Sequence, residues 1–340
     1  MRNDICRVRG MAAAAVLLML FATTSVFAGG SREAAETATR ELKIANFYAA
    51  AHPVNVALRD VFAPMVAEGT NGRYEIQVFD SSSLGAEREL TEGVQLGTIE
   101  MGVAGGLLSA TYPRIGALEL PFLFSDFEHV WRVFDGEIGD EVAEDFADAG
   151  LKVLAWLGNG FRAFSNSVRP INSVADARGI KMRMPENDVY INTGRALGFE
   201  VVAMGFGEVY NAMATGVIDG QDNPLATVFA SRFFEVQDYI AISNHIFSHG
   251  SIVMNMDLWN SLTAADQQVF QQAATEAAAL QRRLLEEATD ELIANLEAEG
   301  IQFSYPDVAE FRAATESVRN GFARNYDWAP RFIETILSLD

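Results

Sequence analysis

Short apolar runs alternate along the chain with longer segments in which apolar residues recur at helical spacing. The short runs predict strands at 41–47, 74–79, 99–104, 151–157, 180–184, 200–204 and 301–305. The longer segments predict helices over 54–68, 87–96, 126–148, 187–197, 207–215 and 263–299. Because strands that alternate with helices are typical of layered folds, we expect an α/β protein.

The segment 263–299 has the strongest helical character. It opens on the capping-like sequence Thr263-Ala264-Ala265-Asp266 and ends at Gly300. An unbroken helix of this length would extend for roughly 50 Å, which exceeds the width of one small domain. We expect it to brace two lobes.

Two junctions between a predicted helix and a predicted strand resemble each other. They read Gly-Thr-Ile-Glu at 97–100 and Gly-Val-Ile-Asp at 216–219, and each glycine can form the left-handed turn that ends a helix. Four similar residues can arise by chance, but they are also the trace that two lobes of similar build would leave.

The first 28 residues have the layout of a secretory signal peptide. Three arginines precede an apolar run at 11–22, and Val26-Phe27-Ala28 offers a cleavage site. The run has about twelve residues, fewer than the roughly 20 that span a bilayer, so we expect cleavage after Ala28 and no membrane insertion of the mature chain. Residues 29–40 read as a flexible leader, and the predicted location is the periplasm.

Composition narrows the range of partners. The chain has 340 residues, of which 49% are hydrophobic and 21% charged, a balance that supports packed cores. Its formal charge of −21 argues against nucleic acid, which is bound through clustered cations. Cys6 is the only cysteine and the four histidines are scattered, so neither disulfides nor a metal site is expected.

Sequence motifs for catalysis are absent. There is no Gly-x-Ser-x-Gly elbow, no His-Glu-x-x-His, no phosphate loop and no dinucleotide Gly-x-Gly-x-x-Gly. We therefore expect no cofactor and no enzymatic activity. An exported α/β hydrolase without its usual motifs is the alternative from that class.

The predicted strand at 180–184 places an arginine apart from the core. Ile180, Met182 and Met184 share one face, while Lys181 and Arg183 share the other. Spacing alone favours a solvated arginine. However, a chain this acidic can hold a small anion only if cations are concentrated in a cleft, and the planar fork of arginine suits a carboxylate.

Three blocks in the second half carry a family resemblance. They are Lys-Met-Arg-Met-Pro at 181–185, Phe-Gly-Glu-Val-Tyr at 206–210, and Gly-Val-Ile-Asp-Gly-Gln-Asp-Asn-Pro at 216–224, with a further match in Asn-Gly-Phe-Arg at 159–162. Over about 41–335 the chain resembles the solute-binding proteins of tripartite ATP-independent periplasmic (TRAP) transporters, of the DctP type. The resemblance implies a two-lobed periplasmic solute-binding fold with a hinge, crossing strands and a long bracing helix.

The resemblance also implies roles for individual residues. Arg183 corresponds to the arginine that holds the substrate carboxylate in a bidentate salt bridge, and Arg162 to one that often assists. Asn223 corresponds to a polar contact, next to Asp222 where the family more often has glutamate. Phe206 falls where an apolar wall commonly faces the ligand, and a core phenylalanine is the other interpretation.

The contribution of the first lobe is placed by approximate alignment. It presents Phe47, His52, Glu87 and the glycine pair 105–106 to the cleft. His249 is a further candidate from the returning segment, with an ordinary loop histidine as the alternative. Because Gly105 and Leu108 stand where sialic-acid-binding members carry polar or charged side chains, a smaller or less hydroxylated acid is expected.

Together these observations predict the solute-binding subunit of a TRAP transporter. Residues 41–158 with 250–288 would form lobe I, and 159–249 with 289–340 lobe II. A small organic acid would be held between the lobes and delivered to the membrane permease subunits. The runner-up is the binding protein of an ATP-driven importer, which shares the two-lobe design.

Overall fold

The computed structural model describes residues 39–340. The predicted signal peptide and leader lie outside this part except for residues 39 and 40, and Arg40 is already the first residue of strand β1 (Arg40–Ala45). Within the described residues, none of the helices combines the length and the apolar character needed to cross a membrane.

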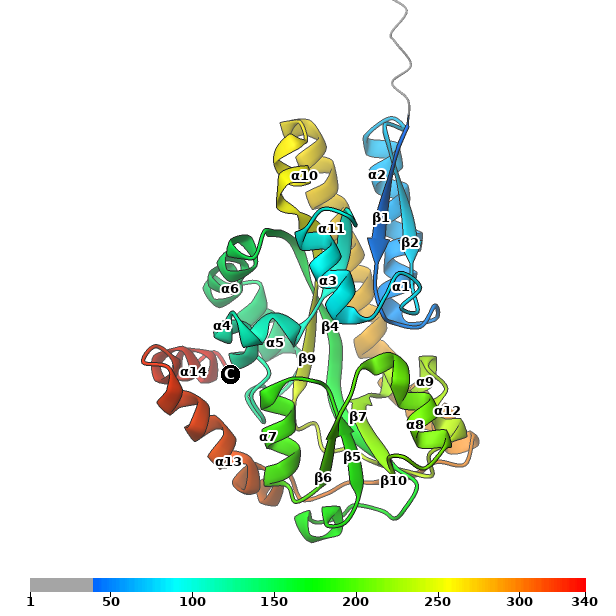
Figure 1. Cartoon of the computed structure of the whole chain (residues 1–340), viewed down its shortest axis with the longest axis vertical. Coiled ribbons are helices and arrows are strands. Elements are labelled where there is room, and N and C mark those ends of the chain that lie inside the picture. The colour runs from blue at the N-terminus through cyan, green and yellow to red at the C-terminus, as the bar shows by residue number, and fades with distance from the viewer. Residues whose placement is uncertain (1–38) are drawn as a thin grey trace, which may run out of the picture. The chain divides into compact units, whose positions relative to one another are not determined.

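One mixed sheet runs through the described part of the chain (Figure 1). Its order is β2-β1-β3-β9-β4-β7-β5-β6, with β8 paired to β4 and β10 paired to β8. The further strands are β2 (Tyr74–Phe79), β3 (Met101–Ala104), β4 (Leu151–Asn166), β5 (Lys181–Met184), β6 (Glu200–Ala203), β7 (Gly220–Pro224), β8 (Tyr239–Ala241), β9 (Phe247–Asn255) and β10 (Gln302–Ser304).

Strand β4 belongs to both halves of the sheet. It pairs antiparallel with β9 as far as Phe161, and from Arg162 onward with β7 and then β8. The register shifts between Gly158 and Gly160, where Gly160 has a φ of 118°, a conformation that favours glycine. The predicted strand 151–157 was therefore too short, because this irregularity lets the strand continue to Asn166 instead of ending it.

Helices cover the sheet and complete the α/β architecture expected from the alternation. They are α1 (Pro53–Ala57), α2 (Ala63–Gly69), α3 (Glu87–Gln95), α4 (Pro113–Ala117), α5 (Phe127–Phe134), α6 (Glu137–Asp148), α7 (Asp188–Ala196), α8 (Val209–Ala214), α9 (Leu225–Ala230), α10 (Met256–Ser261), α11 (Ala264–Glu287), α12 (Thr289–Ala298), α13 (Val308–Asn325) and α14 (Ala329–Leu337). A π-helical turn at Leu58–Phe62 joins α1 to α2.

The bracing role expected for 263–299 is carried by two helices in place of one. Helix α11 packs along β4, α1 and α2, and α12 packs on α9 of the other half. The break falls at Ala288, between Glu286 and Asp290 and between Glu287 and Glu291. Like charges four residues apart destabilise a helix, which gives the break a local cause.

The predicted helix 126–148 is also divided. Helix α5 ends at Phe134, and α6 starts after the N-cap residue Gly136. The turn is tight, because a Cβ on Gly139 would lie 1.8 Å from the carbonyl oxygen of Phe134. A glycine is therefore needed where the second helix closes against the first.

The two similar junctions have the geometry that their glycines predict. Gly97 follows α3 with a φ of 73°, and Gly216 follows α8 with a φ of 71°. Both lie in the left-handed region that ends helices, and the strands that follow are β3 and β7. In each half of the sheet, a helix is thus connected to the next strand by the same kind of left-handed glycine turn.

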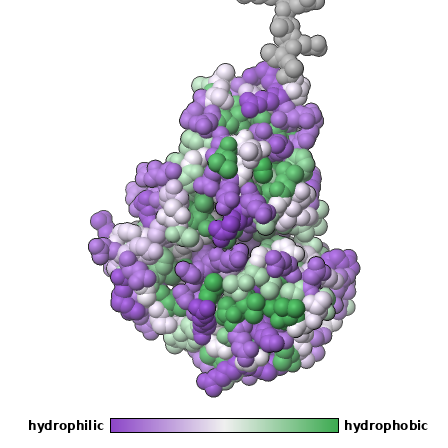
Figure 2. Space-filling view, in the orientation of Figure 1, coloured by the Kyte–Doolittle hydropathy of each residue, from purple (hydrophilic) through white to green (hydrophobic). Residues whose placement is uncertain are grey.

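The visible face of the described part of the chain is largely polar. Figure 2 shows hydrophilic residues over most of the visible face, with apolar residues in separate patches. The apolar side chains otherwise gather inside, as in the cluster of Leu42, Ile44, Phe62 and Phe270 between β1 and the helices α2 and α11. Burial of such side chains drives the packing of helices onto the sheet.

Candidate functional site

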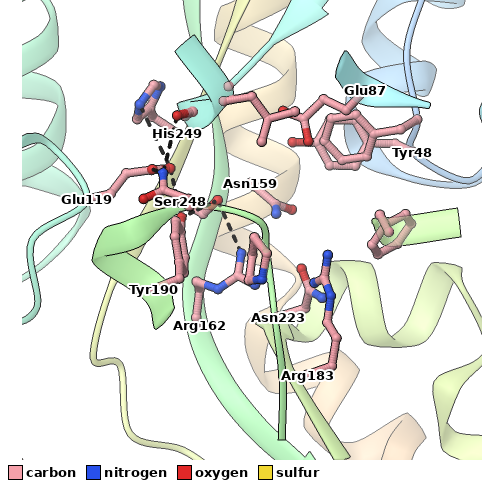
Figure 3. Close-up of a pocket in the computed structure, with 17 residues that line it drawn as sticks. Tyr48, Glu87, Glu119, Asn159, Arg162, Arg183, Tyr190, Asn223, Ser248 and His249 are labelled. Carbon is pink, nitrogen blue, oxygen red and sulfur yellow. Dashed lines mark hydrogen bonds and ion pairs between the residues drawn. The ribbon is translucent and has the colours of Figure 1, made fainter. Parts of the chain in front are cut away.

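A cavity lies where β4 passes from one half of the sheet to the other (Figure 3). Its empty volume is about 470 Å³, part of it open to solvent. Nine of the ten residues that the sequence placed at the cleft line it, namely Phe47, Glu87, Gly105, Gly106, Arg162, Arg183, Phe206, Asn223 and His249. Residues far apart in the chain therefore meet in one place.

Arg183 lies on β5 and is only 3% exposed, unlike its exposed neighbour Lys181. Its Nε and Nη2 donate hydrogen bonds to the carbonyl oxygen of Met204, at 3.0 and 2.8 Å. Among the described residues it forms no ion pair. Burial lowers the pKa of its guanidinium to about 10, so the group stays charged at neutral pH. The interpretation of a solvated surface arginine, which spacing alone favoured, is wrong.

Arg162, by contrast, already has a carboxylate partner. Its Nε lies 2.7 Å from Oδ2 of Asp222, and its Nη2 lies 3.0 Å from Oδ1. Burial opposes ionisation of Asp222, but the charge of Arg162 and the nearby His245 outweigh it and hold the pKa of that carboxyl well below its usual range. Aspartate in place of glutamate is thus long enough to form the bidentate pair.

The cavity has an aromatic wall and an amide beside the arginines. The rings of Phe47 and Phe206 meet edge to face with centroids 5.7 Å apart, and both rings are partly exposed. Asn223 is buried on β7 and donates to the side chain of Gln221. Phe206 also packs on Phe233, so it serves as wall and core at once.

Glu87 is the first residue of α3 and faces the cavity close to Gly105. Burial raises the pKa of its carboxyl to about 7, although the charges of Arg183 and Arg162 act in the opposite direction. His52, also expected at the cleft, does not line the cavity. It stacks behind Tyr48 with ring centroids 4.3 Å apart, and its Nδ1 accepts from the backbone of Val54 to cap α1.

The sequence interpretation missed a buried carboxyl, Glu119. It is 2% exposed and accepts hydrogen bonds from the Tyr190 hydroxyl at 2.7 Å and the Asn187 amide at 2.9 Å. Burial raises the pKa of this carboxyl to about 8 in spite of these bonds. One signal was present in the sequence, since Glu119 is the single charged residue within the apolar run 115–124.

Other lining residues were also missed, among them Tyr48, Asn159 and Ser248. Asn159 lies beside the irregularity in β4, and its side chain accepts from the hydroxyl of Thr227 at 2.6 Å. Asn159 is the first residue of the Asn-Gly-Phe-Arg match at 159–162, but no local pattern marks Tyr48 or Ser248. Within residues 39–340, no three histidine, cysteine, aspartate or glutamate side chains converge as a metal site would require.

Comparison with known proteins identifies the family. Residues 44–325 match the DctP family, described as bacterial extracellular solute-binding protein, family 7. A solute-binding protein of Verminephrobacter eiseniae is 39% identical over 269 residues, which cover 78% of this chain and 80% of the relative. The chain belongs to the DctP-type solute-binding proteins of TRAP transporters, which confirms the resemblance and the expectation of a protein that is not an enzyme.

Solved structures agree with this assignment. A TRAP periplasmic solute-binding protein of Haemophilus influenzae with bound L-gulonate has a TM-score of 0.85 and 30% identity, covering 88% of this chain and 99% of that one. One from a Polaromonas species, bound to D-erythronate, has a TM-score of 0.84 and 34% identity, with coverage of 87% and 98%. The two-lobed periplasmic solute-binding fold is thereby confirmed.

Proposed function

We propose that this protein captures a small monocarboxylic sugar acid and delivers it to the membrane permease subunits of a TRAP transporter. The carboxylate would be held by Arg183, with Arg162 and Asn223 beside it. The observation that carries the proposal is the contrast between the two arginines of the cavity.

The charges of the cavity favour a single carboxylate. Arg162 is neutralised by Asp222, so its charge is already balanced in the folded protein. Arg183 is buried, and the carbonyl of Met204 occupies only one side of its guanidinium. A buried cation is costly unless it is paired, and a ligand carboxylate would supply the missing partner.

The remaining groups suit a hydroxylated carbon chain. Tyr48, Glu87 and Asn159 line the same cavity and carry hydrogen-bonding oxygen or nitrogen atoms, while Phe47 and Phe206 provide an apolar wall. The relatives from Haemophilus influenzae and Polaromonas hold L-gulonate and D-erythronate, both hydroxylated monocarboxylates. These ligands are smaller than sialic acid, which agrees with the class of acid expected from the sequence.

Closure of the two lobes would complete the site. We propose lobe I as 41–158 with 250–288 and lobe II as 159–249 with 289–340, joined by β4 and β9. Since ligand contacts come from both sides of the cavity, a bound acid would shift the population toward the closed state. Export through the signal peptide 1–28 would place the protein where it meets its ligand.

Two other functions are disfavoured. The binding protein of an ATP-driven importer shares the two-lobe design, but the family match is to the TRAP type. An exported α/β hydrolase would be expected to turn over carboxylate esters. The family match, which is to solute-binding proteins, gives no support to that function.

A thermal-shift panel followed by titration calorimetry tests the proposal. The panel contains L-gulonate, D-erythronate, D-glucuronate, succinate and the neutral L-gulonolactone. At 100 times Kd, a sugar acid should stabilise the protein by about 2.7 kcal/mol, a shift of several degrees in Tm, whereas the lactone should not. Binding of lactone and acid with equal affinity would contradict the proposed role of the carboxylate.

A further inference from the structure

One side of the cavity is lined by polar groups that the carboxylate contact leaves unused. Figure 3 shows Glu119, Tyr190, Ser248 and His249 together on one side, with Arg183 on the other. The sequence interpretation named only His249 of these four and gave it no chemistry.

His249 on β9 is the least satisfied member of this group. It is 2% exposed, and neither ring nitrogen has a hydrogen-bond partner among the described residues, although the backbone of Ile115 approaches the ring. Burial lowers its pKa to about 4, so the ring is neutral at pH 7 and offers one donor and one acceptor. An unpaired buried polar group costs about 1–3 kcal/mol, which points to a partner that arrives from the cavity.

Glu119 adds acceptor capacity beside this histidine. Its Oε1 lies 3.9 Å from Nε2 of His249, too far for a direct hydrogen bond. Tyr190 and Asn187 each donate one bond to the carboxyl, which leaves further lone pairs unused. The gap between the two side chains is therefore lined by hydrogen-bonding atoms that do not satisfy one another.

Gly106 makes room for this arrangement. A Cβ on Gly106 would lie 1.9 Å from Oε2 of Glu119, so any larger residue would displace the carboxyl. The neighbouring Ser248 hydroxyl makes only long contacts, at 3.4 Å, to Tyr190 and to Arg162. The group is thus held in place while remaining incompletely bonded.

We propose that Glu119, Tyr190 and His249 form a hydroxyl-binding subsite for the tail of the acid whose carboxylate lies at Arg183. This assignment rests on the proposed function. A hydroxyl both donates and accepts, which matches a neutral imidazole beside a carboxyl and a phenol. The substrate class that follows is an acid with hydroxyls at the end remote from its carboxylate, long enough to reach across the cavity.

The decisive variant is His249→Phe. The ring already lies among aromatic side chains, 5.5 Å from Phe134 and 6.0 Å from Trp156 between centroids, so phenylalanine keeps the packing. Because no hydrogen bond is lost in the ligand-free protein, its Tm should stay unchanged or rise. Its affinity for L-gulonate, measured by titration calorimetry, should fall by about tenfold or more.

His129→Phe is the matched control. His129 is equally buried, but its Nε2 bonds to the carbonyl oxygen of Ile336 at 2.8 Å, away from the cavity. This variant should lose thermal stability and keep its affinity for L-gulonate. Tyr190→Phe provides a second variant of the subsite, because it removes the phenol hydroxyl and keeps the ring. It should weaken the binding of L-gulonate more than that of D-erythronate, whose chain is two carbons shorter.

The outcomes separate this inference from the function on which it rests. If His249→Phe and Tyr190→Phe both fold and bind L-gulonate as tightly as the unchanged protein, the subsite is refuted while the proposed function stands. If the unchanged protein binds none of the sugar acids in the panel, the proposed function fails and the subsite with it. Detectable binding of L-gulonate but not D-erythronate by the unchanged protein would support a contact with the tail.

Discussion

Replacing Arg183 by alanine removes the group that the proposed function depends on. Its side chain is 3% exposed, so the lost contact is a desolvated one, and a ligand carboxylate left unpaired there should cost about 2–5 kcal/mol of binding free energy. At about 1.4 kcal/mol per tenfold change, Kd for L-gulonate should rise by about 30-fold to a few thousand-fold. The carbonyl of Met204 also loses its donor, but water in the vacated space can replace it.

Arg183→Lys sharpens the test. A lysine keeps the charge, but its ammonium cannot reproduce the planar fork that meets Met204 on one side and would meet the ligand carboxylate on the other. Its affinity should therefore fall between those of the unchanged protein and the alanine variant. The control is Lys181→Ala, which removes an exposed cation from the same strand and should leave Kd within about twofold.

Titration calorimetry measures the affinities, and the Tm of each ligand-free variant shows that it is folded. If Arg183→Ala folds and binds L-gulonate within threefold of the unchanged protein, the assignment of the carboxylate to Arg183 is refuted. An equal loss in Lys181→Ala would show that the effect is one of net charge and not of a specific contact.

Three further changes test the electrostatics and packing around the cavity. Asp222→Asn leaves Arg162 as an unpaired buried charge and should lower the unfolding free energy by about 3 kcal/mol, with an unchanged Tm as the contrary result. Burial raises the pKa of Glu87 from 4.5 to about 7, so the folded state holds a proton that the unfolded chain releases, and stability is lost as pH rises through that range. The Tm of Glu87→Gln relative to the unchanged protein should therefore increase between pH 5 and pH 8, and a constant difference would contradict this pKa. Gly158→Ala would bring a Cβ within 3.0 Å of Phe247, Trp131 and Leu285. It should lower the unfolding free energy by about 1–3 kcal/mol, measured by chemical denaturation. An unchanged unfolding free energy would show that the side chains around Gly158 can move aside without cost.

The strands and helices that the sequence predicts well are those with a strong local pattern. In β5, the alternation places Met182 and Met184 in the core as expected. The same alternation gives the face of Arg183 but not its burial, which is caused by the cavity wall and by Met204, a residue 21 positions later. Local periodicity predicts the face of a strand on which a residue lies. It does not predict which other segments bury that face.

Polar strands and buried polar clusters are harder to predict. Strand β7 reads Gly-Gln-Asp-Asn-Pro and has no apolar alternation, yet all five residues are buried because β4 and β5 flank it. Glu119 meets its partners 68 and 71 positions away along the chain. Such contacts follow from the topology of the sheet, which local sequence patterns do not give. Only the family resemblance predicted that part of the site, including Arg183, Arg162 and Asn223, would lie together.

The central claim is that the guanidinium of Arg183 holds the carboxylate of a hydroxylated acid. A crystal structure of the complex with L-gulonate tests it directly. The account predicts both carboxylate oxygens within hydrogen-bond distance of Arg183, with Arg162 still paired to Asp222. A bound acid with its carboxylate turned away from Arg183 would contradict the account.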